Sequence, residues 1–164
     1  MTADKLAPAH KGQSGESVRQ HNLSTVLRLV HLQGTILRSK ITATTGLNRS
    51  TVSDLVSELA ELGLLVEKET AASTGVGRPS MAVTATDNIV AFSVNPEIDA
   101  TTVSAVALSG RVVTKERRLM RSHPTADNAI AVASEMIAKM RKELEPGTRI
   151  VGVGVSVPGQ VRSS

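Results

Sequence analysis

The chain has 164 residues, of which 40% are apolar, and a net charge of +4, so it is long enough for one medium domain or two small ones. It has no cysteine, which excludes disulfides, thiol catalysis and cysteine-held metal. Its single aromatic residue, Phe92, argues against binding of single strands or RNA by base stacking. No run approaches the roughly 18 apolar residues of a membrane span, and the N-terminus lacks the apolar stretch of a signal peptide. We therefore expect a cytoplasmic protein with no membrane partner.

Residues 1–19 form a polar segment with proline, glycine and serine, and this composition predicts a flexible tail. From about residue 20 to residue 65 the apolar residues recur with a helical period, and the pattern that follows is typical of strands. A segment rich in glycine and proline, "STGVGRPS", interrupts these strands. We expect two folded parts, residues 20–87 and residues 88–164.

Two helices are predicted at the start of the first part. The first covers about Asn22–Gln33 and ends at Gly34. The second is short, about Ser39–Thr45, with Ser39 as its cap, Ile41 facing inward and Gly46 supplying the turn that follows. The apolar face of the first helix consists of Leu23, Val26, Leu27 and Val30, flanked by Leu29.

A third helix is predicted from Asn48, which is a good N-cap residue, to Leu62. Gly63 is expected to end it in the left-handed conformation. Its apolar positions have the spacing of a single buried stripe: Val52, Leu55, Val56, Leu59 and Leu62.

The opposite face of the third helix is polar and carries short side chains. They are Arg49, Ser50, Thr51, Ser53, Asp54 and Ser57. Short hydroxyl side chains let a helix approach the major groove of DNA closely, and an arginine at its N-terminal end reaches phosphate or guanine. Helix-turn-helix geometry consists of a helix, a short helix, a turn with glycine and a last helix whose N-terminal end contacts the bases, and the predicted elements follow this order. The simpler alternative is a capped surface helix, since Ser and Thr are common at helix starts.

Asp54 fits this face least well, because its carboxylate repels phosphate unless it accepts a hydrogen bond from a cytosine amine or faces a neighbouring cation. The strand, loop and strand that follow predict a β-wing. The glycines beside Arg78 favour its entry into the narrow minor groove, although a turn with a solvated arginine is the alternative. The predicted DNA-contacting residues are Arg38, Lys40, Asn48, Arg49, Ser50, Thr51, Ser53, Asp54, Ser57 and Arg78.

The second part has the pattern β-β-β-α-β. Three segments, "IVAFSVN", "TTVSAVALS" and "RVVTKERRLM", predict strands, with Ser109-Gly110 as a tight turn between the second and third. The segment "TADNAIAVASEMIAKMRKEL" predicts an amphipathic helix capped by Thr125. The last segment, "RIVGVGVSVPG", is rich in glycine and β-branched residues and predicts a buried strand.

Together, "TGLNRSTVSDLVSELAELGLL", "GVGRPS" and "GVGVSVPGQV" resemble the N-terminal part of ROK-family transcriptional regulators, over about residues 20–161. The helix-turn-helix portion also resembles the broader MarR type. The resemblance implies an α+β chain: a winged helix-turn-helix followed by an incomplete ribonuclease H-like (actin-like ATPase) lobe. It further implies a repressor of carbohydrate-use genes, an operator in double-stranded DNA, and, in a full-length protein, a sugar effector and homo-oligomers. An incomplete lobe is expected to leave a sheet edge and one sheet face uncovered.

A sugar kinase is the alternative function, because the same family contains kinases. Kinases of this family have an Asp-x-Gly-Gly-Thr phosphate loop after the first strand. The matching stretch here, Ser93–Glu97, lacks the aspartate and the glycines. The segment "GVGVSVPG" lacks the Lys-Ser/Thr ending of a phosphate loop. The four histidines have no metal-site spacing. We therefore predict no catalytic residues, no metal and no cofactor.

Overall fold

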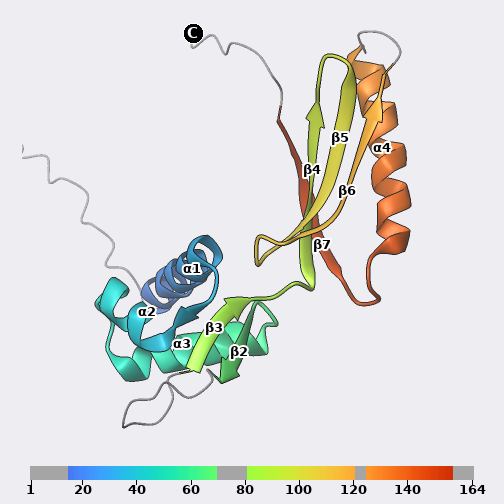
Figure 1. The fold of residues 1–164 in the computed structure, drawn as a ribbon. Coiled ribbons are helices and arrows are strands. Elements are labelled where there is room, and N and C mark those ends of the chain that lie inside the picture. Colours follow the sequence, from blue (N-terminus) through green and yellow to red (C-terminus); the bar gives the residue numbers. More distant parts are fainter. Residues whose placement is uncertain (1–14, 70–80, 121–124, 157–164) are drawn as a thin grey trace, which may run out of the picture.

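The computed structural model describes residues 15–69, 81–120 and 125–156, which form an N-terminal and a C-terminal unit joined between two strands (Figure 1). The elements, in chain order, are α1 (Gly15–Gln33), β1 (Ile36–Leu37), α2 (Arg38–Thr45), α3 (Arg49–Glu61), β2 (Leu65–Glu69), β3 (Met81–Ala85), β4 (Ile89–Pro96), β5 (Ala100–Ala107), β6 (Val112–Leu119), α4 (Ala126–Glu143) and β7 (Arg149–Val155). The predicted α+β class is confirmed.

The N-terminal unit packs three helices against a small sheet of order β1-β3-β2. Both strand pairs are antiparallel, and the β2–β3 ladder runs from Leu65↔Ala85 to Glu69↔Met81. Apolar stripes of the helices and the inner face of the sheet meet in one core, because the 3.6-residue and 2-residue periods each place apolar side chains on one face. Its buried members are Leu23, Val26, Val30, Ile36, Ile41, Val52, Leu55, Val56, Leu59, Leu65, Val83 and Ala85.

The first helix is longer than the sequence predicted. It begins at Gly15, whereas we expected residues 15–19 to belong to a flexible tail. These residues carry no apolar stripe, but two polar contacts hold the added turns. Gln20 donates to Glu16 at 3.1 Å, one turn away, and Arg19 forms an ion pair with Glu58 on α3. Residues 1–14 lie outside the described part of the chain.

Three further details of this unit differ from expectation. The N-cap of α2 is Leu37 and not Ser39, because Leu37 is held in the extended conformation by its pairing in β1. Strand β1 itself was not predicted, since two residues give no visible period. Leu62 is 54% exposed, because the helix ends at Glu61 and Leu62 lies beyond the buried stripe. Gly63, as predicted, is left-handed, with a φ of 69°.

The C-terminal unit has a four-stranded sheet of order β6-β5-β4-β7, which agrees with the predicted order β-β-β-α-β along the chain. The three strands β6, β5 and β4 are antiparallel, and β7 pairs with β4 in parallel after the α4 crossover. Helix α4 packs on one face of β4 and β5, and its Met136 and Met140 are buried beside Phe92. Thr125 caps α4 as predicted, by accepting from the backbone of Asn128 at 3.3 Å.

Strand β7 is exposed along its whole length, so the prediction that it is buried is wrong. Its composition is that of a covered strand, but in the described residues it has only one neighbour, β4, and α4 packs over the other strands. Val151, Val153 and Val155 are 64%, 55% and 61% exposed. Within the part of the chain that the structure describes, the expected uncovered sheet edge is therefore present at β7. Among the described helices, none has both the length and the apolar character needed to cross a membrane.

Candidate nucleic-acid interface

Helices α2 and α3 are joined by a short turn that leaves the start of α3 accessible. Gly46 has a φ of 72°, which favours glycine, and its N–H donates to the Thr42 carbonyl at 3.0 Å to end α2. Asn48 then begins α3, because its Oδ1 accepts from the backbone N–H of Thr51 at 2.8 Å. Asn48, Arg49 and Ser50 at this end of α3 are exposed, and the N-terminal end of a helix attracts phosphate.

A hollow of about 390 Å³ lies between α2 and α3. Its lining includes two arginines and three hydroxyl residues, which are hydrogen-bond donors, although Arg38 and Thr42 already donate within the protein. Sequence reasoning missed two of these residues, Ser39 and Thr42, although their spacing places them on one face of α2. The lining residues are Arg38, Ser39, Thr42, Arg49, Val52 and Ser53.

The predicted DNA-contacting residues on α2 and α3 are mostly accessible. Lys40 on α2 is exposed. On α3, the N-cap residue and four of the predicted residues are also exposed, while Thr51 and Ser53 are half-buried. On α3 the spacing of these positions by three and four residues places most of them along one face. The exposed residues of α3 and its cap are Asn48, Arg49, Ser50, Asp54 and Ser57.

Arg38 differs from Lys40 and Arg49 because its guanidinium already binds other side chains of the protein. Its Nη1 donates to Ser53 Oγ on α3 at 3.1 Å, and its Nη2 forms an ion pair with Glu67 on β2. Its Nε is buried without a hydrogen-bond partner in the described residues. Arg38 thus connects α2, α3 and β2, and Glu67 balances its charge locally.

Two further predicted residues participate in the helix cap. Ser50 Oγ donates to Asn48 Oδ1 at 2.8 Å, so this side-chain oxygen accepts from both Ser50 and Thr51. The amide nitrogen of Asn48 is the group left to donate to a partner. The cap itself orients the first turn of α3.

Asp54 makes no ion pair within the described part of the chain. The sequence suggested two explanations for Asp54, and the described residues contain no ion pair that supports one of them, a neighbouring cation. Acceptance from a cytosine amine stays a prediction. Arg78 falls in residues 70–80, outside the described residues, so its contribution also stays a prediction. The strands on either side of that segment, β2 and β3, are paired up to Glu69 and Met81.

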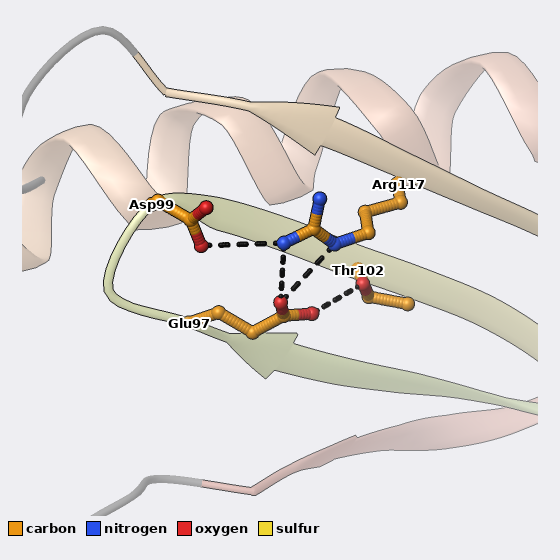
Figure 2. Close-up of polar contacts among 4 residues, drawn as sticks. All are labelled: Glu97, Asp99, Thr102 and Arg117. Atoms are coloured by element: carbon orange, nitrogen blue, oxygen red, sulfur yellow. Dashed lines mark hydrogen bonds and ion pairs between the residues drawn. The ribbon is translucent and has the colours of Figure 1, made fainter.

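The position of the kinase phosphate loop holds a different structure in this chain. Ser93 to Pro96 are the last residues of β4 and pair with β5. Beyond them, the Glu97 carboxylate accepts from Arg117 Nε at 3.1 Å, from Arg117 Nη2 at 2.8 Å and from Thr102 Oγ1 at 2.7 Å (Figure 2). The Glu97 N–H donates to the Ala100 carbonyl at 2.7 Å.

This cluster has the chemistry of a structural ion pair. Arg117 also donates to Asp99 at 3.2 Å, so one guanidinium joins the β4–β5 turn to β6 (Figure 2). The hydrogen bonds from Arg117, and then that from Thr102, lower the pKa of Glu97 below its ordinary value. A carboxylate at this position repels the phosphate that a kinase loop binds. The described residues contain no group of three or more acidic or histidine side chains able to hold a metal ion.

The chain is similar to several bacterial regulators, although no family model matches it. It is 30% identical over 162 residues to the DNA-binding transcriptional dual regulator NagC of Escherichia coli K12, covering 95% of this chain and 39% of NagC. It is 27% identical to the xylose repressor of Caldicellulosiruptor bescii, covering 87% of this chain and 36% of that protein. It is 27% identical to the xylose repressor of Bacillus subtilis, covering 88% and 38%. The chain spans about two-fifths of the length of these relatives.

A solved structure has a similar fold. It is described as a ROK family transcriptional regulator, a homologue of the Escherichia coli MLC protein. The TM-score is 0.56 at 18% sequence identity, and the match covers 87% of this chain and 36% of the other. The match extends over most of this chain, so the shared fold includes elements of both units.

Proposed function

Because the chain belongs to the ROK family of transcriptional regulators, we propose that it binds specific sequences in double-stranded DNA and regulates transcription through them. The observation that carries the proposal is the accessible start of α3 beside the hollow that Arg38 and Arg49 line. Direct reading of base edges requires a helix that enters the major groove with polar side chains in its first turns. Arg49, Ser50 and Ser53 supply them, and the α3 dipole adds attraction for phosphate.

We further propose that the regulated genes serve carbohydrate use and that the protein acts as a repressor. The support is that several of its relatives are sugar-related repressors, among them an N-acetylglucosamine repressor of Shigella flexneri and xylose repressors. A sugar effector and a homo-oligomer belong to the same proposal. Both concern a protein of the relatives' full length, of which this chain spans about two-fifths.

The proposed function does not include catalysis. The β4–β5 turn carries Glu97 bound to Arg117 at the place where related kinases hold phosphate, and its amide is used within the turn. A coupled assay with ATP and a panel of sugars is expected to give no turnover. Sugar-dependent ATP hydrolysis would support the kinase alternative instead.

Selection from a randomised double-stranded DNA library tests the proposal directly. The 164-residue chain is expected to enrich one short motif over the starting pool, because its bases are read by side chains and not by charge alone. Binding without enrichment of any motif would reduce the protein to a non-specific DNA binder. No binding at low salt would remove the DNA function altogether.

A further inference from the structure

The two units are joined by only three residues between strands, Thr86 to Asn88, because β3 ends at Ala85 and β4 begins at Ile89 (Figure 1). Each of these residues has two soft backbone dihedrals, so a linker of this kind does not by itself fix the angle between the units. The β5–β6 turn, Leu108 to Arg111, contacts this linker. We refer to it as the junction turn.

The contact between linker and junction turn is centred on Asp87. Ser109 Oγ donates to its Oδ1, and Arg111 Nε donates to its Oδ2 at 2.9 Å. The Ser109 hydroxyl, and then Arg111, lowers the pKa of Asp87 below its ordinary value, so the carboxylate is charged at neutral pH. The Ser109 N–H also donates to the Thr86 carbonyl at 3.2 Å. Both oxygens of Asp87 are therefore used to hold the turn against the linker.

The junction turn also reaches the N-terminal unit itself. His31, in the last turn of α1, lies with Nδ1 2.6 Å from the Leu108 carbonyl, and since a carbonyl can only accept, Nδ1 donates. The Leu108 side chain is partly buried against the core of the N-terminal unit. Leu108 of the C-terminal unit thus extends the core of the N-terminal unit. Arg149 at the start of β7 adds a long contact, 3.5 Å, to the Leu62 carbonyl.

A simpler explanation is that Asp87 only stabilises its own bend, as aspartates in turns often do through their own backbone. The observed partners do not fit this, because Ser109 and Arg111 follow Asp87 by 22 and 24 positions and belong to a hairpin of the other sheet. We propose that the junction turn sets the orientation of the N-terminal unit on the C-terminal unit, and that Asp87 is the positioning residue that holds the turn in place. A shift of β5 or β6 is then transmitted to α1 through Leu108. The inference does not depend on DNA binding.

The orientation can be measured directly on the whole chain, because it contains no cysteine and introduced cysteines are the only labelling sites. The parent for this test carries Glu61→Cys at the end of α3 and Ala138→Cys on α4, both at exposed positions. Spin labels at these two sites report the distance between the units by pulsed electron resonance. The parent is expected to give a single narrow distance distribution.

Asp87→Ala is expected to abolish the single narrow peak and give a broad distribution. Ser109→Ala removes the other side of the same contact and is expected to do the same. Asp99→Ala is the matched control, because it removes an aspartate that pairs with Arg117 at 3.2 Å at the β4–β5 turn. It is expected to keep the narrow peak.

A narrow, unshifted peak in both Asp87→Ala and Ser109→Ala would overturn the proposal. An equal broadening in Asp99→Ala would also overturn it, because loss of any surface ion pair would then suffice. Circular dichroism of each variant checks that both units stay folded, and Asp87 is exposed, so its removal leaves the two cores intact.

Discussion

Arg38 and Arg49 line the same hollow, but their surroundings assign them different tasks. Arg38 is tied to Ser53 and Glu67 and is half-buried, whereas Arg49 is exposed at the start of α3. A guanidinium that already pairs with a carboxylate has little net charge to offer a phosphate. We therefore propose that Arg38 holds α2, α3 and β2 together and that Arg49 is the one that contacts DNA.

Arg38→Ala is expected to lower the free energy of unfolding of the N-terminal unit by roughly 1–3 kcal/mol, because it leaves a partly buried carboxylate without its partner. Urea denaturation followed by circular dichroism measures this. Lys40→Ala, on the same helix but exposed, is the control and is expected to change stability little. Equal stability of Arg38→Ala and the parent would show that the contact with Glu67 contributes nothing to the fold.

The Glu97–Arg117 cluster predicts how the C-terminal unit responds to acid. Hydrogen bonds from Arg117 and Thr102 lower the pKa of Glu97 in the folded state, so its stabilising contribution is present above the unfolded pKa of about 4.3. That contribution is lost as the pH falls through the lower, folded pKa. Glu97→Gln should melt at a lower temperature than the parent at pH 7, and the difference should shrink below about pH 4.

Glu61→Gln is the control for this experiment, since Glu61 is exposed and forms no ion pair within the described residues. It is expected to melt like the parent across the pH range. A melting difference for Glu97→Gln that persists unchanged into strong acid would mean that packing, and not the charge of Glu97, is responsible.

The elements with a clear period were predictable from the sequence, and those held by distant contacts were not. The stripe from Val52 to Leu59 and the cap residues Asn48 and Thr125 act locally, and they were confirmed. The early start of α1 depends on Arg19 meeting Glu58, and strand β1 depends on its pairing with β3. Neither contact leaves a signal in its own segment of the sequence.

The candidate site shows the same division. The face of α3 followed from spacing, since neighbouring turns place Arg49, Ser53 and Ser57 in line. The engagement of Arg38 with Glu67 joins residues 29 positions apart, so only the fold reveals it. The exposure of β7 was not predicted, because the composition of a strand shows whether it can be buried and not whether other elements cover it.

At the scale of the whole molecule, the net charge of +4 gives little long-range attraction for DNA, and residues 1–88 carry 9 Lys and Arg against 8 Asp and Glu. DNA affinity must then depend on a few close contacts with phosphate. The logarithm of the binding constant should fall with the logarithm of salt concentration with a slope of about −0.9 for each phosphate neutralised. Lys40→Ala should make that slope less steep by about 1, and Arg38→Ala should leave it nearly unchanged, because Glu67 already balances Arg38.

A titration with labelled DNA between about 50 and 200 mM salt measures these slopes. The charge-matched control is Lys142→Ala, an exposed lysine at the end of α4 in the C-terminal unit. It is expected to keep the slope of the parent. An affinity independent of salt would be incompatible with any phosphate contact by these residues.

The central claim is that the start of α3 reads bases, and a comparison of Arg49→Ala with Arg141→Ala in the same library selection tests it most directly. Arg141 is an exposed arginine of α4, so the two variants remove the same side chain from different units. Arg49→Ala is expected to lose roughly 1–3 kcal/mol on the enriched motif and to relax preference at one base position. Arg141→Ala should select the motif of the parent with unchanged preference. If Arg49→Ala instead enriches the parent's motif with the parent's affinity, α3 does not read DNA.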